Sequence, residues 1–66
     1  MDWDNLRIFL AIARAGQILS AAKALHVNHA TVARRLDALE ESLGTKLFER
    51  RTTGTVLTPA GEKLLI

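Results

Sequence analysis

The stretch 27–44, VNHATVARRLDALEESLG, decides the fold of this chain. Its apolar residues recur at steps of four, three and four, at Val32, Leu36, Leu39 and Leu43. At 100° per residue they point within about 40° of one another, so one face of a helix can be buried. Asn28 stands where an N-cap accepts a first-turn N–H, and Gly44 stands where the chain must leave the helix with positive φ.

The opposite face of this helix has a charge pattern that indicates a polyanionic partner. It is small or basic in its N-terminal half and acidic in its C-terminal half, with Ala30, Ala33, Arg34, Asp37 and Glu41. A merely solvated helix favours acids in its first turn, where the helix dipole stabilises them. Here Arg34 and Arg35 come first, and small residues allow close approach to phosphates or base edges. We interpret this stretch as a recognition helix.

Composition restricts the possible classes of protein. The 66 residues make one small domain, and 48% of them are hydrophobic, so we expect a packed core rather than disorder. Without cysteine there is no disulfide and no thiolate metal site, which fits the cytoplasm. The longest apolar run, 8–13, is too short to span a bilayer, and Asp2 and Asp4 argue against a signal peptide. Because the net charge is only +2, its distribution matters more than its sum.

Two helices are expected before the recognition helix. The first covers Trp3–Ala15, with Asp2 or Asp4 as cap and Gly16 as its end; its inner stripe comprises Trp3, Leu6, Phe9, Leu10 and Ala13. A shorter, alanine-rich helix begins at Ser20 as cap, and Leu25 supplies its core contact. Only residues 26–28 then precede the recognition helix, so the pair predicts a helix-turn-helix, a pattern that many αα-hairpins share.

The pattern changes to β after Gly44. We predict strands over Lys46–Arg51 and Thr55–Thr58, joined by a loop at 52–54: a small hairpin, or wing. Arg50 and Arg51 lie near its tip and point to opposite faces. We expect Arg50 to be structural, because Glu49 and the helix ends are near in sequence, and Arg51 to be the wing contact.

A final helix is predicted from Thr58 as cap and Pro59 as first helical residue. The sequence ends in an apolar run, 64–66, without a C-cap. We therefore expect this chain to be the first domain of a longer protein. The aromatic residues Trp3, Phe9 and Phe48 are all expected in the core.

Three segments together resemble the N-terminal DNA-binding domain of the LysR-type transcriptional regulators. They are AAKALHV at 21–27, LEESLGTKLFERR at 39–51 and LTPAGE at 57–62. The resemblance implies a mainly α winged helix-turn-helix domain over 1–58, with its motif at about 18–37. Residues 59–66 would begin a long linker helix that dimerises. An α/β domain outside this sequence would bind a small-molecule effector, and no cofactor is expected in this chain.

The resemblance also assigns DNA contacts to the start of the recognition helix and to the wing. These positions are Asn28, His29, Ala30, Thr31, Ala33, Arg34, Arg35, Arg51 and Thr53. The family often has Gln where this chain has His29, Pro where it has Ala30, and Ser where it has Ala33. The family's base preference therefore does not carry over to His29 and Ala33. Arg34 is expected on a guanine or a phosphate, and Arg35 on a phosphate or on Glu41.

The leading hypothesis is a bacterial, cytoplasmic regulator that binds double-stranded DNA as a dimer on a partly palindromic operator. Enzymatic activity is not expected, because Ser20 has neither a base nor a Gly-flanked elbow. A His26–His29 metal site is disfavoured by the turn between them; His26 is expected in that turn and His29 at the DNA surface. The rival is a protein-interaction module that uses an acidic face, Asp37, Glu40 and Glu41, and an exposed end, Leu64–Ile66.

Overall fold

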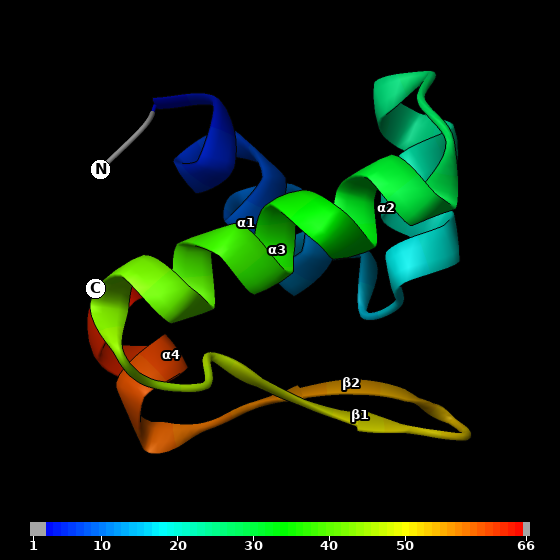
Figure 1. Cartoon of the computed structure of the whole chain (residues 1–66). Helices are drawn as coiled ribbons and strands as arrows, with labels where there is room; N and C mark the ends of the chain where they lie inside the picture. Colours follow the sequence, from blue (N-terminus) through cyan, green and yellow to red (C-terminus); the bar gives the residue numbers. More distant parts are fainter. Residues whose placement is uncertain (1–2, 66) are drawn as a thin grey trace.

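The chain folds into four helices and a two-stranded antiparallel sheet (Figure 1), and the computed structural model describes residues 3–65. The elements are α1 (Trp3–Ala15), α2 (Ile18–Leu25), α3 (His29–Leu43), β1 (Phe48–Arg51), β2 (Gly54–Leu57) and α4 (Pro59–Leu65). The predicted mainly α, winged helix-turn-helix architecture is confirmed. Within the described range no single helix is long and apolar enough to cross a membrane; only the pair α1 and α2, bent by 119°, meets that test by length and composition.

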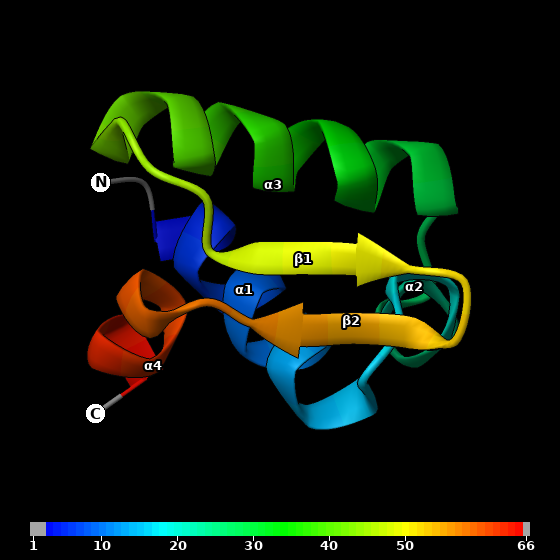
Figure 2. The same cartoon turned by 90° about the horizontal axis from the view of Figure 1, so that it is seen from below.

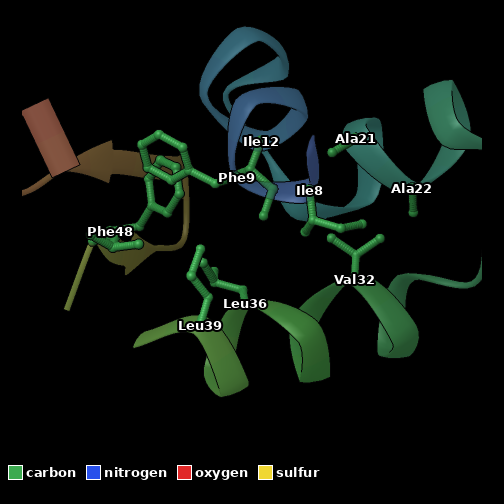
Figure 3. Close-up of a cluster of buried hydrophobic side chains, with 10 residues drawn as sticks. Ile8, Phe9, Ile12, Ala21, Ala22, Val32, Leu36, Leu39 and Phe48 are labelled. Atoms are coloured by element: carbon green, nitrogen blue, oxygen red, sulfur yellow. The ribbon is translucent and has the colours of Figure 1, made fainter. Parts of the chain in front are cut away.

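The core lies where α1, α2 and α3 meet above the inner face of the hairpin (Figure 3). Its largest fully buried side chains are Phe9, Ile12, Val32, Leu36, Leu39 and Leu47. Ala21 and Ala22 are also buried, which lets α2 approach its neighbours closely. The rings of Phe9 and Phe48 lie 5.3 Å apart between centroids, so an aromatic pair joins α1 to the root of the wing.

The bounds of α1 match the prediction, but its rotation does not. Ile8 and Ile12 are buried with Phe9, whereas Leu6, Leu10 and Ala13 are only partly buried. Trp3 is 72% exposed, so its predicted place in the core is wrong. The segment 6–13 is apolar almost all round, and such a helix shows no unique inner stripe. Asp4 lies inside the first turn of α1, and the alternative cap, Asp2, falls outside the described residues.

The caps of α3 are as predicted. The Asn28 side chain accepts the Ala30 N–H at 2.7 Å, and Gly44 ends the helix with φ 71°. Val32, Leu36 and Leu39 are fully buried, but Leu43 is 40% exposed because it is the last helical residue.

The two ends of α2 differ in how well the sequence predicted them: the turn after the helix is correct, and the cap before it is wrong. His26 adopts the left-handed conformation, φ 58°, and so occupies the turn as expected. The predicted Ser20 cap is wrong. The helix begins at Ile18 after an extended Gln17, whose side chain makes no capping bond. Ser20 therefore lies in the first turn of α2.

The hairpin is tighter than predicted. The ladder pairs Phe48 with Leu57 and Arg51 with Gly54, so only Thr52 and Thr53 form the turn, and Lys46 precedes the first strand. A Cβ on Gly54 would lie 2.7 Å from the carbonyl oxygen of Gly16. The next amide, Thr55 N–H, donates to that same carbonyl at 2.8 Å. Glycine at 54 thus allows the wing to contact the α1–α2 turn.

The start of α4 is locked to the segment that precedes β1. The Thr58 hydroxyl accepts the Gly61 N–H at 3.1 Å, which confirms its capping role, and donates to the Lys46 carbonyl at 2.6 Å. A side chain at Gly61 would collide with the Leu47 carbonyl. Leu64 is half-buried against the core and Leu65 is exposed. The prediction of an exposed end at 64–66 is therefore wrong for Leu64 and confirmed for Leu65. Ile66 lies outside the described residues.

Candidate nucleic-acid interface

The first two turns of α3 present their outer side chains to solvent. His29, Ala30 and Arg34 are exposed, and Thr31, Ala33 and Arg35 are partly buried. The buried Val32 and Leu36 hold the opposite face against the core, so the helix cannot rotate without exposing them. This half of the helix is therefore a rigid platform for a small set of side chains.

The wing tip lies toward the same end of the molecule as the N-terminus of α3, and α4 lies at the opposite end (Figures 1 and 2). Arg51 directly precedes the Thr52–Thr53 turn, and both Arg51 and Thr53 are exposed. The fold thus brings the two groups of predicted site residues, from α3 and from the wing, to one end of the domain.

The arginines of this end differ in their partners. Arg34 forms no ion pair with any residue in 3–65, so its guanidinium is available to a ligand. Arg51 lies 3.3 Å from a Glu49 carboxylate oxygen, and both side chains are more than half exposed. Such a surface pair contributes little stability and can be exchanged for a phosphate. Arg35 makes no pair with Glu41 in the described range.

Arg50 has the structural role that was predicted, with a different partner. Its guanidinium donates to Asp37 of α3 at 2.6 Å instead of pairing with Glu49. The contact joins the middle of β1 to the recognition helix. The pair is exposed, with the Arg50 side chain 42% and the Asp37 side chain 57% accessible, so it orients the wing more than it stabilises the fold. The sequence had placed Asp37 on a free outer face.

Glu40 is the residue that sequence reasoning misplaced. It is 4% exposed, and one carboxylate oxygen accepts the backbone N–H groups of Leu47 at 2.7 Å and Phe48 at 3.3 Å. The other oxygen lies 3.7 Å from the Lys46 ammonium. A usable signal was present, because Glu40 follows the buried Leu36 by four residues and so shares its face. The acidic surface of the rival hypothesis therefore loses its central member.

Metal binding finds no support in the geometry. His26 ends α2 and His29 begins α3, on either side of the turn. Among residues 3–65 no group of three His, Cys, Asp or Glu side chains is placed to hold a metal ion.

Comparison with known sequences identifies the domain. The family model of the bacterial regulatory helix-turn-helix proteins of the lysR family matches residues 3–62. The chain belongs to this family. It is 48% identical over 65 residues to the transcriptional regulator YofA of Bacillus velezensis, covering 98% of this chain and 23% of YofA. It is 43% identical to ClcR of Pseudomonas putida, covering 98% of this chain and 22% of ClcR.

Solved structures agree with the fold. The complex of the CbnR DNA-binding domain with DNA superposes with a TM-score of 0.96 at 43% identity, covering 98% of this chain and 75% of that one. Full-length AphB of Vibrio cholerae gives 0.92 at 36% identity, covering 97% of this chain and 22% of that one. The chain spans about a quarter of the length of the curated relatives it matches.

Family membership confirms the resemblance, the fold class and the expectation that this domain is a regulatory module rather than an enzyme. The individual contact residues, the boundary at 58 and the role of α4 in assembly remain predictions.

Proposed function

We propose that this domain binds double-stranded DNA in a sequence-specific manner, as part of a bacterial LysR-type transcriptional regulator. The N-terminal half of α3 enters the major groove, and the wing contacts the minor groove or the backbone. The similarity to a CbnR domain that was crystallised with DNA supports this mode of binding.

The observation that carries the proposal is Arg34 on the exposed face of α3, which forms no ion pair with any other described residue. Ala30 lies one helical turn before Arg34, and Ala33 lies directly before it. At these two positions no bulky side chain keeps the helix from the floor of a groove. A guanidinium so placed can donate two hydrogen bonds to the O6 and N7 atoms of guanine. The methyl groups of the alanines are suited to apolar contact with a thymine methyl.

The remaining site residues are assigned by position. His29 and Thr31, in the first turn of α3, contribute hydrogen bonds at the groove edge, and Asn28 combines its cap with a place beside the backbone. Arg35 faces a flanking phosphate. Arg51 and Thr53 reach the DNA from the wing. Phosphate contacts of this kind fix the register of the protein on the duplex, while the base contacts of α3 provide the sequence preference.

We propose that the protein dimerises through the long helix that α4 begins. A dimer would place two recognition helices in successive major grooves of a partly palindromic operator in the cytoplasm. The seven described residues of α4 are too few for a helix that is stable alone in water. We expect the 66-residue chain to be mainly monomeric, or weakly dimeric, at micromolar concentration, as measured by sedimentation. A tight dimer would show that α1 or the wing supplies the interface instead.

The decisive experiment first selects a preferred duplex, the operator, from a random pool in vitro, and then titrates salt with this operator and with a random duplex. DNA binding releases condensed counterions, so the association constant should fall steeply and linearly with salt on a double logarithmic scale. The operator should bind more tightly than the random duplex throughout. Binding that is indifferent to salt and to duplex sequence would remove the proposal.

A further inference from the structure

We infer that Glu40 is a positioning residue for DNA binding, because its buried carboxylate fixes the root of the wing against the recognition helix. The inference rests on the proposed function and deepens it: Glu40 touches no DNA, yet it sets where the wing arginine meets the duplex. The observation behind it is the convergence of two backbone N–H groups on one oxygen of this side chain.

The two amides require this acceptor. Leu47 is 1% exposed and Phe48 is 4% exposed, and the ladder with β2 begins only at Phe48. A buried N–H without a partner is costly, and a carboxylate is a stronger acceptor than a neutral group. The Leu47 carbonyl is used in turn by the Thr58 N–H at 3.0 Å. Glu40 thus holds the point at which the chain enters the wing.

Asp37 supplies a second attachment one helical turn earlier. Residues three apart are neighbours on a helix surface, and Asp37 reaches Arg50 while Glu40 reaches the backbone at 47 and 48. In Figure 2 β1 runs in roughly the opposite direction to α3, and the two contacts join the helix to the chain at residues 47 and 48 and at Arg50. Arg51 follows directly, and its distance from Arg34 depends on both attachments.

Simultaneous contact of Arg34 and Arg51 with one duplex requires a defined distance between the two side chains. Arg34 and Arg51 lie on different elements, and both must meet the same rigid ligand at once. Side chains that act together need a supporting shell that holds them within a fraction of an ångström. Loosening the wing root therefore weakens the wing contact without touching the groove contact.

The sign of the effect separates this role from simple electrostatics. Glu40→Gln removes a negative charge, and charge alone would make the protein bind a polyanion more tightly. Positioning predicts the opposite. The matched control is Glu49→Gln, the same chemical change on an exposed side chain of β1 that faces Arg51. The amide oxygen of Gln still accepts the two N–H groups, but more weakly than a carboxylate does, so we expect operator affinity to fall about fivefold for Glu40→Gln and to stay or rise for Glu49→Gln.

A double-mutant cycle distinguishes positioning from general damage. In an Arg51→Ala background the wing contact is already lost, so Glu40→Gln should weaken binding by no more than about twofold. In an Arg34→Ala background the full loss should persist. Equal losses in both backgrounds, or tighter binding by Glu40→Gln, would overturn the inference. Failure of the wild type to prefer the operator would instead count against the proposed function.

Two further measurements keep the inference testable if Glu40→Gln does not fold. Glu40→Asp retains the charge but is too short by one methylene. Circular dichroism gives its folded fraction, and the operator affinity of the folded molecules should show the same selective loss. If both variants unfold, hydrogen exchange of the wild type decides. The Leu47 and Phe48 amides should be as protected as core amides, with Thr53 exchanging far faster. Rapid exchange at 47 and 48 would show that the attachment is not maintained in solution.

Discussion

The two halves of α3 share one buried face and differ completely on the other. In the N-terminal half the outer side chains are small or basic and Arg34 has no partner in the described part of the chain. In the C-terminal half the acids are occupied: Asp37 holds Arg50, and Glu40 is buried under the root of the wing. In the proposed mode of binding, the N-terminal half faces the DNA and the C-terminal half supports the wing.

This difference explains why the charges of α3 are arranged against the helix dipole. Acids in the first turn would be favoured by about 0.3–1 kcal/mol each, but they would repel a polyanion there. Placed late, Asp37 accepts from Arg50 of β1, and Glu40 accepts from the Leu47 N–H just before β1. A single helix thus sets both its own orientation and that of the wing.

The substitution with the largest expected effect disrupts the buried face that both halves of α3 share. Leu36 is fully buried in the middle of α3, and Leu36→Ala should cost about 2–5 kcal/mol through the lost contacts and the cavity. A domain this small has a margin of only a few kcal/mol, so much of the population should unfold. Thermal melting measures this. A melting curve like that of the wild type would mean that the inner face is not the one described.

The next effect compares adjacent acids in the C-terminal half. Glu40→Ala leaves the buried Leu47 and Phe48 N–H groups without their acceptor and should cost about 2–4 kcal/mol. This is about 1–2 kcal/mol for each donor, in the lower part of the range for an unsatisfied group, because the Phe48 bond is long at 3.3 Å. Glu41→Ala changes an exposed residue next to it and should stay within about 0.5 kcal/mol. Chemical denaturation of both variants measures the contrast. Equal costs would show that burial does not distinguish the two acids.

Much of this arrangement is predictable from local sequence signals. The apolar spacing of Val32, Leu36 and Leu39, the Asn28 cap and the Gly44 end each follow from short-range geometry, and all are confirmed. The bounds of α1 follow for the same reason. Where several rotations of an apolar helix are equally good, as in α1, only the neighbouring helices decide which residues are buried, and Trp3 was therefore misplaced.

The site was harder to predict where its partners are distant in sequence. Glu40 and Leu47 are seven residues apart, and Asp37 and Arg50 are thirteen apart. In each pair α3 ends, at Leu43, before the second residue, so no helical or strand period links the two partners. Glu40 stands beside Glu41 and one helical turn after Asp37, so the sequence grouped the three acids on one solvated face. The tight wing turn was missed because Gly54 was taken as loop, whereas its role is to let the chain pass the Gly16 carbonyl.

A smaller effect tests the ligand-facing half. Arg34→Ala removes an exposed side chain and should leave the melting temperature unchanged, while weakening operator binding by about 1–3 kcal/mol if the guanidinium reads a base. If it holds only phosphate, operator and random duplexes should weaken together. Arg7→Ala removes an exposed arginine of α1 and is the control for lost charge. Binding like that of the wild type on both duplexes would take Arg34 out of the interface.

The smallest effect concerns Asn28, where the helix cap and the predicted DNA contact coincide. Asn28→Ala loses the bond to the Ala30 N–H and should cost about 1 kcal/mol of stability, whereas Asn28→Gly should cost only a few tenths, because glycine is itself an acceptable N-cap. Both substitutions delete the same amide group. If Asn28 contacts DNA directly, the two variants should lose operator affinity equally despite their different stabilities. If it acts only by holding the first turn of α3, affinity should follow stability, and Asn28→Gly should bind almost as tightly as the wild type.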